Sequence, residues 1–194
     1  TGPDDAYGFG KFPGQYGFAI LSKQPIDHPG IRTFQHLLWS SVPDAKLPTM
    51  PNDPSKGWYN DVALSRVRLS SKNHVDVPVL IGGQRLHLLV SHPTPPVFDG
   101  PENRNGLRNH DEIRLWSDYI TPDRAQYMVD DAGRAGGLAT DASFIIAGDL
   151  NADPVDGDSE IAAIQQLLNH GRIHPSVARG EQVPRSAGGA QNAK

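Results

Sequence analysis

The strongest constraint on the fold is a pair of apolar segments joined by two glycines. Residues 75–81 and 84–90 flank Gly82-Gly83, and a Gly-Gly pair suits the positive φ angles of a tight hairpin turn. The second segment is apolar at nearly every position, which predicts a strand covered on both faces. The sequence therefore predicts an antiparallel hairpin within a larger sheet.

Further strands accompany this hairpin in a chain of 194 residues, which is long enough for one domain with a substantial core. Short apolar runs predict a strand at residues 16–22 and others within 33–40 and 58–69. A buried strand is predicted at residues 143–147, directly before Gly148. We expect a single domain over residues 1–194.

Two amphipathic patterns predict helices. Asn109 with Glu112 three residues later has the form of a capping box, which predicts a helix from Asn109 to Ile120. A second helix is predicted after Asp158 or Ser159, with apolar side chains at positions 161, 164, 167 and 168 on one face. Mixed strands and helices indicate an α/β domain.

Composition restricts the class of protein. Hydrophobic residues make up 37% and charged residues 21%, which is typical of a globular chain rather than a disordered one. The absence of cysteine excludes disulfides and thiolate metal sites. A net charge of −4 argues against binding nucleic acid mainly through a basic surface. No apolar run approaches the length of a membrane span.

Asp149 and Asn151 lie two positions apart at the carboxyl end of the predicted buried strand. If the chain stays extended, both side chains point the same way. A carboxylate there can orient an attacking water or bind a hard cation, and an amide can hold a phosphate oxygen. The alternative is a plain turn, since Asp, Asn and Pro are ordinary turn residues.

A calcium loop is a second alternative for this segment. Asp149, Asn151, Asp153 and Glu160 match the first, third, fifth and twelfth positions of an EF-hand. However, Pro154 stands where the sharp turn of that loop needs glycine, and the preceding pattern is a strand rather than a helix. Both departures argue against an EF-hand.

Polar residues elsewhere are candidates for substrate binding. His92 follows the second hairpin strand and begins a proline-rich loop, a suitable place for an active-site histidine or for an ordinary surface one. Asn105 and Arg108 belong to a polar run before Glu112, and arginine suits bidentate binding of phosphate. A solvated entry to the helix explains the same run equally well.

Three motifs in this order resemble the endonuclease/exonuclease/phosphatase superfamily, which is also called deoxyribonuclease I-like. The first is the strand ending in Gly148-Asp-Leu-Asn151, with Leu150 where the family usually has Phe. The second is the strand that ends before His92, followed by a helix. The third is Gly17-Phe-Ala-Ile-Leu-Ser with Pro25 close behind.

The resemblance implies a four-layer α/β sandwich of two packed mixed sheets with helices outside. It implies a Mg²⁺ or Mn²⁺ ion, sometimes aided by Ca²⁺, at Asp149 and Asn151. Asp149 would then orient or activate the attacking water, Asn151 would bind the scissile phosphate, and His92 would contact it or transfer a proton. The expected substrate is a phosphate ester, either a small molecule or a nucleic acid.

Two motifs, residues 12–17 and 91–102, look similar to a bacterial subgroup that is exported, so we expect a secreted or periplasmic protein. The family also has an N-terminal strand with a metal-binding glutamate and a C-terminal Ser-Asp-His, and neither stands in this sequence. His174, in Ile173-His-Pro175, does not match the latter motif. We therefore expect that these segments belong to the same gene product, with this chain as its internal part.

Two functions remain open on the sequence alone. One is a metal-dependent hydrolase of phosphate mono- or diesters, which is either a nuclease or a small-molecule phosphatase. The other is a non-catalytic binding or scaffold module of the same fold. The acidic balance favours small or lipid-derived phosphates over nucleic acid.

Overall fold

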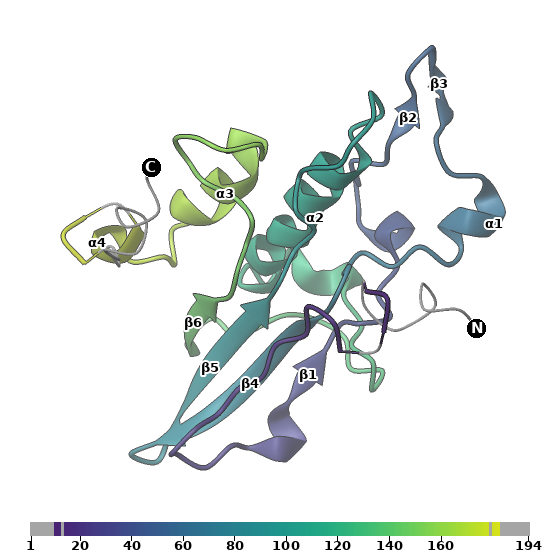
Figure 1. The fold of residues 1–194 in the computed structure, drawn as a ribbon. Coiled ribbons are helices and arrows are strands. Elements are labelled where there is room, and N and C mark those ends of the chain that lie inside the picture. Colours follow the sequence, from purple (N-terminus) through teal and green to yellow (C-terminus); the bar gives the residue numbers. More distant parts are fainter. Residues whose placement is uncertain (1–9, 13, 179, 183–194) are drawn as a thin grey trace.

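A four-stranded sheet organises the part of the chain that the computed structural model describes, residues 10–12, 14–178 and 180–182. Its strands are β1 (Arg32–Thr33), β4 (His74–Ile81), β5 (Gln84–Ser91) and β6 (Ser143–Ala147), in the order β1-β4-β5-β6 (Figure 1). β5 and β6 run parallel, whereas the other two pairs are antiparallel, so the sheet is mixed. The predicted α/β class is confirmed.

The predicted hairpin is confirmed in every respect that fixes its register. β4 and β5 pair from His74 with Ser91 to Ile81 with Gln84. Gly82 and Gly83 have φ angles of 58° and 82°, the left-handed conformation that a tight hairpin turn requires. The residues just before β4 and just after β5 therefore lie at the same end of the sheet.

Two helices form the layer against this sheet. In the described residues the α-helices are α1 (Asp61–Leu64), α2 (Arg104–Tyr119), α3 (Ile161–Leu168) and α4 (Pro175–Ala178), and the 3-10 turns are His28–Gly30, Trp39–Ser41 and Ala125–Tyr127. α2 crosses one face of the sheet, and α3 packs beside α2 (Figure 1). Among the described residues, no helix is long and apolar enough to cross a membrane.

The core lies between α2 and the sheet. Trp116 Nε1 donates a hydrogen bond of 2.8 Å to Ser91 Oγ on β5, and the Tyr119 hydroxyl donates one of 2.6 Å to Asp76 on β4. Fully buried apolar residues fill the space around them: Phe34, Trp39, Leu69, Leu89, Ile113, Leu115, Ile120 and Met128. The rigid α2–sheet layer supports the loops at the end of β5 and β6.

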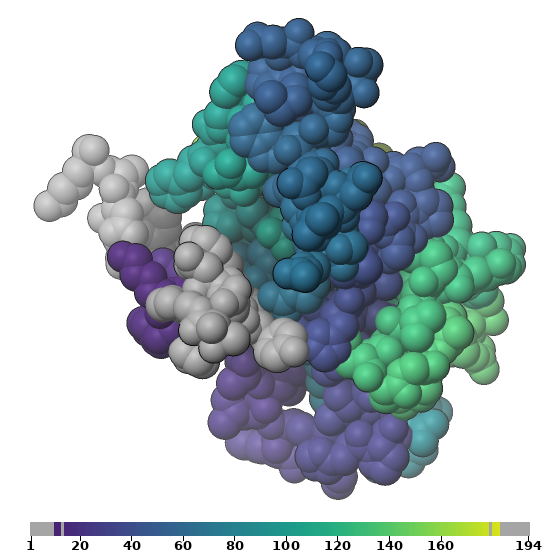
Figure 2. Space-filling view, turned by 90° about the vertical axis from the view of Figure 1, so that its right-hand side faces the viewer, coloured from purple at the N-terminus to yellow at the C-terminus, as the bar shows by residue number. Residues whose placement is uncertain are grey.

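A small two-stranded sheet stands apart from this layer. Its strands are β2 (Thr49–Met50) and β3 (Asp53–Gly57), which pair antiparallel with an irregular register. Figure 2 shows them projecting at the top of the molecule, above α1. They lie in the proline-rich segment between the first strand and the hairpin.

The strand predicted at residues 16–22 is wrong. These residues form no ladder with the described strands, and Leu21 is 93% exposed. The chain pairs with the edge of β4 slightly later, where Leu80 N donates to Pro25 O and Asp27 N donates to Pro78 O, both at 2.9 Å. Pairing therefore begins after the apolar run rather than within it.

The strand predictions at 33–40 and 58–69 also need correction. β1 ends at Thr33, and the second segment contains α1, because Asn60 Oδ1 accepts a hydrogen bond from Ala63 N and caps that helix. β6 has the predicted bounds, but it is not fully buried. Its alternate residues are exposed, and Ile145 is 49% exposed, whereas Phe144 and Ile146 on the other face pack against the core.

The predicted helix caps are wrong, although both helices are present. α2 begins at Arg104, five residues before Asn109, and its first amides are bonded by Asp99, whose carboxylate accepts from Asn105 N and Gly106 N. α3 has Glu160 at its N-cap without a side-chain hydrogen bond, so neither Asp158 nor Ser159 caps it. Asn109 and Glu112 instead lie within α2, where both are buried and form hydrogen bonds with backbone groups of distant loops.

Candidate active site

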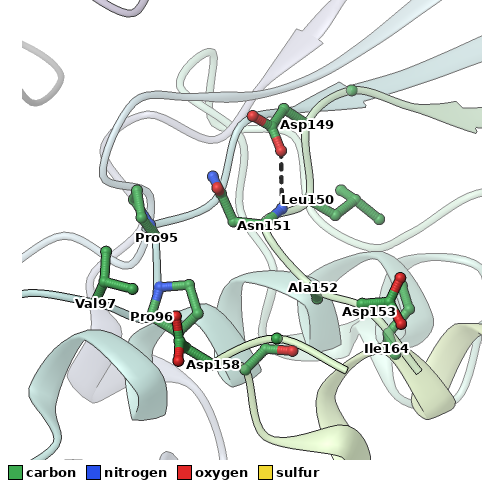
Figure 3. Close-up of a pocket in the computed structure, with 13 residues that line it drawn as sticks. Pro95, Pro96, Val97, Asp149, Leu150, Asn151, Ala152, Asp153, Asp158 and Ile164 are labelled. Carbon is green, nitrogen blue, oxygen red and sulfur yellow. Dashed lines mark hydrogen bonds between the residues drawn. The ribbon is translucent and has the colours of Figure 1, made fainter. Parts of the chain in front are cut away.

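The segment after β6 forms a turn at the end of the sheet. Gly148 has a φ angle of 136° and Asn151 one of 51°, and Asn151 N donates a hydrogen bond of 3.0 Å to Asp149 Oδ1 (Figure 3). The expectation that both side chains point the same way along an extended strand is therefore wrong. Asp149 and Asn151 nevertheless line the same pocket.

His92 lies directly opposite this turn. Val90 pairs with Ala147 in the parallel register of β5 and β6, so the residues that follow the two strands emerge side by side. His92 Nε2 lies 3.8 Å from Asp149 Oδ2. His92 Nδ1 lies 3.2 Å from the carbonyl oxygen of Tyr16, and donation to that oxygen leaves Nε2 free to accept a proton.

The pocket beside Asp149, here called the Asp149 pocket, has a volume of about 790 Å³. The Asp149 side chain is 68% exposed, so its carboxylate is accessible from the solvent. The lining residues come from the loop after β5, from the segment between β6 and α3, and from α3 itself (Figure 3): Pro95, Pro96, Val97, Gly148, Asp149, Leu150, Asn151, Ala152, Asp153, Gly157, Asp158, Ser159 and Ile164.

Asn109 of α2 ties the two loops of this site together. Its Nδ2 donates to Thr94 O at 2.9 Å and to Leu150 O at 3.0 Å. Asn151 Nδ2 adds a second link, because it donates to Pro93 O at 3.1 Å. These bonds hold the Asp149 turn against the loop that carries His92.

Glu112, one turn further along α2, bonds the ends of the hairpin. Its Oε1 accepts from Ser71 N at 2.7 Å, and its Oε2 accepts from Thr94 N at 2.5 Å. The side chain is fully buried. Sequence reasoning assigned Glu112 to a helix cap and missed this role.

A second pocket, here called the Lys72 pocket, has a volume of about 630 Å³ and lies on the other side of the proline loop. Its lining residues are Tyr16, Tyr59, Ser71, Lys72, His92, Thr94, Pro95, Val97, Phe98, Arg104, Asn105 and Arg108. Pro95 and Val97 line both pockets, and His92 lines this one. The histidine therefore faces a larger site than the Asp149 turn alone.

Asn105 and Arg108, the predicted substrate-binding residues, both line the Lys72 pocket. Each also makes structural bonds: Asn105 Nδ2 donates to Val97 O at 2.8 Å, and Arg108 Nε donates to Leu69 O at 2.9 Å. Their side chains are thus fixed at the pocket wall. Their contact with substrate stays a prediction.

His74 lies under this site, with Nδ1 2.6 Å from Ser70 Oγ and Nε2 2.8 Å from Glu112 O. Burial lowers the pKa of His74 to about 4; Glu112 opposes this effect, and Lys72 adds to it. The folded pKa lies below the ordinary value of 6.5, so the unfolded chain binds more protons between these pH values. Stability from neutral His74 is present above pH 6.5 and is lost as the pH falls toward 4.

We therefore predict that protonation linked to His74 lowers the free energy of unfolding by about 3 kcal/mol between pH 7 and pH 4. Urea unfolding at several pH values in this range measures the effect. His74→Gln should remove this part of the pH dependence, and His28→Gln, at an exposed position, should retain it. Equal pH dependence in the two variants would contradict the prediction.

The sequence matches the Endonuclease/Exonuclease/phosphatase family over residues 2–192. The chain belongs to this family. No curated protein and no solved structure matches the chain. The endonuclease/exonuclease/phosphatase family consists largely of hydrolytic enzymes and includes metal-dependent phosphoesterases and nucleases, so a phosphate-ester substrate fits its members. Export of the protein and the further terminal segments stay predictions.

Enzymes of this family generally use divalent metal ions. The exposed Asp149 carboxylate is a type of donor that such ions bind. An exposed carboxylate lies in an open pocket next to an amide, and Mg²⁺ is typically bound by one or two carboxylates while it keeps several waters. Among the described residues, no group of three or more His, Cys, Asp or Glu side chains could hold a metal ion. The arrangement fits an ion that shares its coordination with substrate rather than a closed protein cage.

Proposed function

We propose that the protein hydrolyses phosphate esters with the help of a divalent metal ion, most simply Mg²⁺ or Mn²⁺, with Ca²⁺ as a further candidate. Asp149 binds the ion or orients the attacking water. His92 accepts or donates a proton through Nε2, and Asn151 contacts the phosphate. The metal ion, when bound, would supply positive charge to the phosphate oxygens and lower the pKa of a bound water.

The observation that carries this proposal is the approach of His92 to Asp149 across the ends of two parallel strands. Their side chains lie 3.8 Å apart at the mouth of open pockets, whereas 57 positions separate them in the sequence (149 minus 92). An imidazole with an accessible nitrogen beside a carboxylate is suited to proton transfer to or from water. Membership of the family supports hydrolysis as the class of reaction. His92 and Asp149 are the side chains proposed to carry it out.

Asn151 is held in place for its proposed role. Its amide has two N–H donors, one of which is used by Pro93 O. The second donor can bond a phosphate oxygen without a change in side-chain position. The fixed amide and the left-handed backbone at Asn151 support a binding role rather than a purely solvated turn.

A small phosphorylated molecule is the substrate class that we favour over nucleic acid. The net charge of −4 offers no general attraction for a polyanion. The two pockets have volumes in the range typical of small-molecule sites. A nuclease acting on DNA remains the competing outcome of the assay below.

The test uses the full-length protein, because we expect this chain alone to be inactive, and compares hydrolysis of a phosphomonoester, an aryl phosphodiester and plasmid DNA, each with Mg²⁺, Mn²⁺, Ca²⁺ or EDTA. We expect metal-dependent turnover, and we expect Asp149→Ala to lower it by about 10³-fold and His92→Ala by a similar factor. Asp141→Ala, an exposed carboxylate just before β6, is the matched control and should keep the wild-type rate.

Two results would overturn the proposal. One is the absence of turnover for every substrate and metal, which would favour the non-catalytic scaffold. The other is turnover in Asp149→Ala equal to that of wild type. Cleavage of plasmid DNA alone would retain the hydrolase and reject the small-molecule substrate.

A further inference from the structure

The two neighbouring pockets carry opposite charges. Of the described residues, three with carboxylates line the Asp149 pocket, Asp149, Asp153 and Asp158, and no Lys or Arg does. The described residues that line the Lys72 pocket include Lys72, Arg104 and Arg108 and no Asp or Glu. An acidic pocket suits a cation, and the adjoining basic pocket suits an anion.

Three buried polar side chains of the Lys72 pocket have hydrogen-bonding capacity that the described residues leave unused. Within the part of the chain that the structure describes, Ser71 Oγ and Thr94 Oγ1 have no hydrogen-bond partner. Lys72 is only 6% exposed, its Nζ donates to Pro93 O at 3.0 Å, and no ion pair of the described residues includes it. An ammonium has three donors, so it too has bonding capacity left.

Glu112 explains why these three groups meet. Its carboxylate bonds the backbone amides of both Ser71 and Thr94, and it thereby fixes two segments that are 23 positions apart (94 minus 71). Ser71, Lys72 and Thr94 then lie together in the wall of one cavity. A buried polar group without a partner costs roughly 1–3 kcal/mol, so a cluster of them is expected where a ligand completes the bonding.

Lys72 also connects this cluster with the catalytic turn. Lys72 Nζ and Asn151 Nδ2 donate to the same atom, Pro93 O. Burial lowers the pKa of Lys72, and Glu112 and Asp149 oppose this effect. An anion next to Lys72 would compensate the loss of hydration of its ammonium group.

We infer that Ser71, Lys72 and Thr94 form a phosphate-binding subsite beside His92. The ammonium supplies the charge, the two hydroxyls donate hydrogen bonds to phosphate oxygens, and Arg108 adds positive charge at the pocket wall. The assignment of this phosphate to a substrate rests on the proposed function. The binding itself needs neither the metal ion nor turnover.

The test is a calorimetric titration of the protein with inorganic phosphate in EDTA. Wild type should bind one phosphate per chain. Lys72→Met, which keeps the apolar stem, should weaken binding by at least about tenfold, the effect expected for loss of a charge-assisted hydrogen bond. Lys23→Met, an exposed lysine, is the matched control and should bind like wild type.

Thr94→Val and Ser71→Ala separate a ligand role from a structural one. Each should weaken phosphate binding by about threefold to tenfold while the melting temperature stays the same or rises, because a buried unsatisfied hydroxyl is removed. Absence of stoichiometric phosphate binding by wild type would overturn the inference. So would wild-type affinity in both hydroxyl variants and in Lys72→Met.

Asp149→Ala distinguishes this inference from the proposed function. It should abolish hydrolysis and retain phosphate binding, since removal of a nearby negative charge does not weaken an anion site. If the wild-type protein binds phosphate but does not hydrolyse any substrate, the proposed function is wrong and the phosphate subsite stands. If the wild-type protein hydrolyses a substrate but does not bind phosphate in the Lys72 pocket, the inferred subsite is wrong and the proposed function stands.

Discussion

Glu112→Ala is expected to destabilise the fold by roughly 4 kcal/mol, since a hydrogen bond to a buried charged group contributes about 1.5–3 kcal/mol and this carboxylate accepts two. The substitution leaves Ser71 N and Thr94 N without their acceptors. It also opens a cavity between α2 and the loops, because the side chain is fully buried. Urea unfolding at pH 7 measures the loss.

Glu160→Ala is the control for this prediction. Glu160 pairs with Lys46 at 2.6 Å, but both side chains are about one-third exposed, so the pair contributes about 1 kcal/mol or less. The loss of stability in Glu112→Gln should lie between the losses in these two variants. The glutamine amide still has one oxygen that accepts from a backbone amide, but its NH₂ group presents a donor to the other backbone amide. If Glu112→Ala and Glu160→Ala unfold at the same urea concentration, Glu112 does not bond the hairpin ends as described.

Local sequence patterns predicted the elements whose conformation is determined by residues close together in the sequence. The hairpin around Gly82-Gly83 and the bounds of β6 follow from short apolar runs and turn chemistry. The buried Ile164 and Leu167 of α3 follow from helical spacing. These features need no knowledge of the rest of the chain, so the sequence alone could predict them.

The two polar residues misassigned to the cap of α2 both bond distant backbone groups. Asn109 and Glu112 have the spacing of a capping box, yet they bond the loops at Thr94, Leu150 and Ser71. A local pattern cannot distinguish a helix's own amides from those of a loop 15 or more positions away. Burial inside α2, which only the packed structure shows, decides between them.

The candidate site was partly predictable for the same reason. His92, Asp149 and Asn151 stand directly after strands, where the sequence motifs placed them. The sequence analysis did not predict a binding role for Lys72. The predicted hairpin already implied its position, because pairing of His74 with Ser91 places the residues before β4 next to those after β5. The sequence could not show that burial leaves the Ser71 and Thr94 hydroxyls without hydrogen-bond partners among the residues that the structure describes.

Gly148→Ala should cost roughly 3 kcal/mol of stability, through overpacking and an unfavourable φ angle together. A Cβ atom at Gly148 would overlap the carbonyl oxygen of Ser91, which belongs to the neighbouring strand, and the φ angle of 136° is one that side chains rarely adopt. Neither backbone can move away freely, because Val90 and Ala147 pair in the ladder just before them. Thermal and urea unfolding measure this effect.

The same substitution should also lower hydrolysis, because relief of the overlap must separate β5 from β6 where His92 and Asp149 face each other. Gly157→Ala is the informative control: it has a φ angle of 99° but no atom closer than 3.8 Å to the added Cβ, so it has the backbone strain without the overlap. Gly171→Ala, which has neither, should be neutral. If Gly148→Ala costs no more stability than Gly157→Ala, the close approach of the two strand ends does not control the site. A larger loss of stability together with a lower kcat would show that this contact sets the distance between the histidine and the carboxylate.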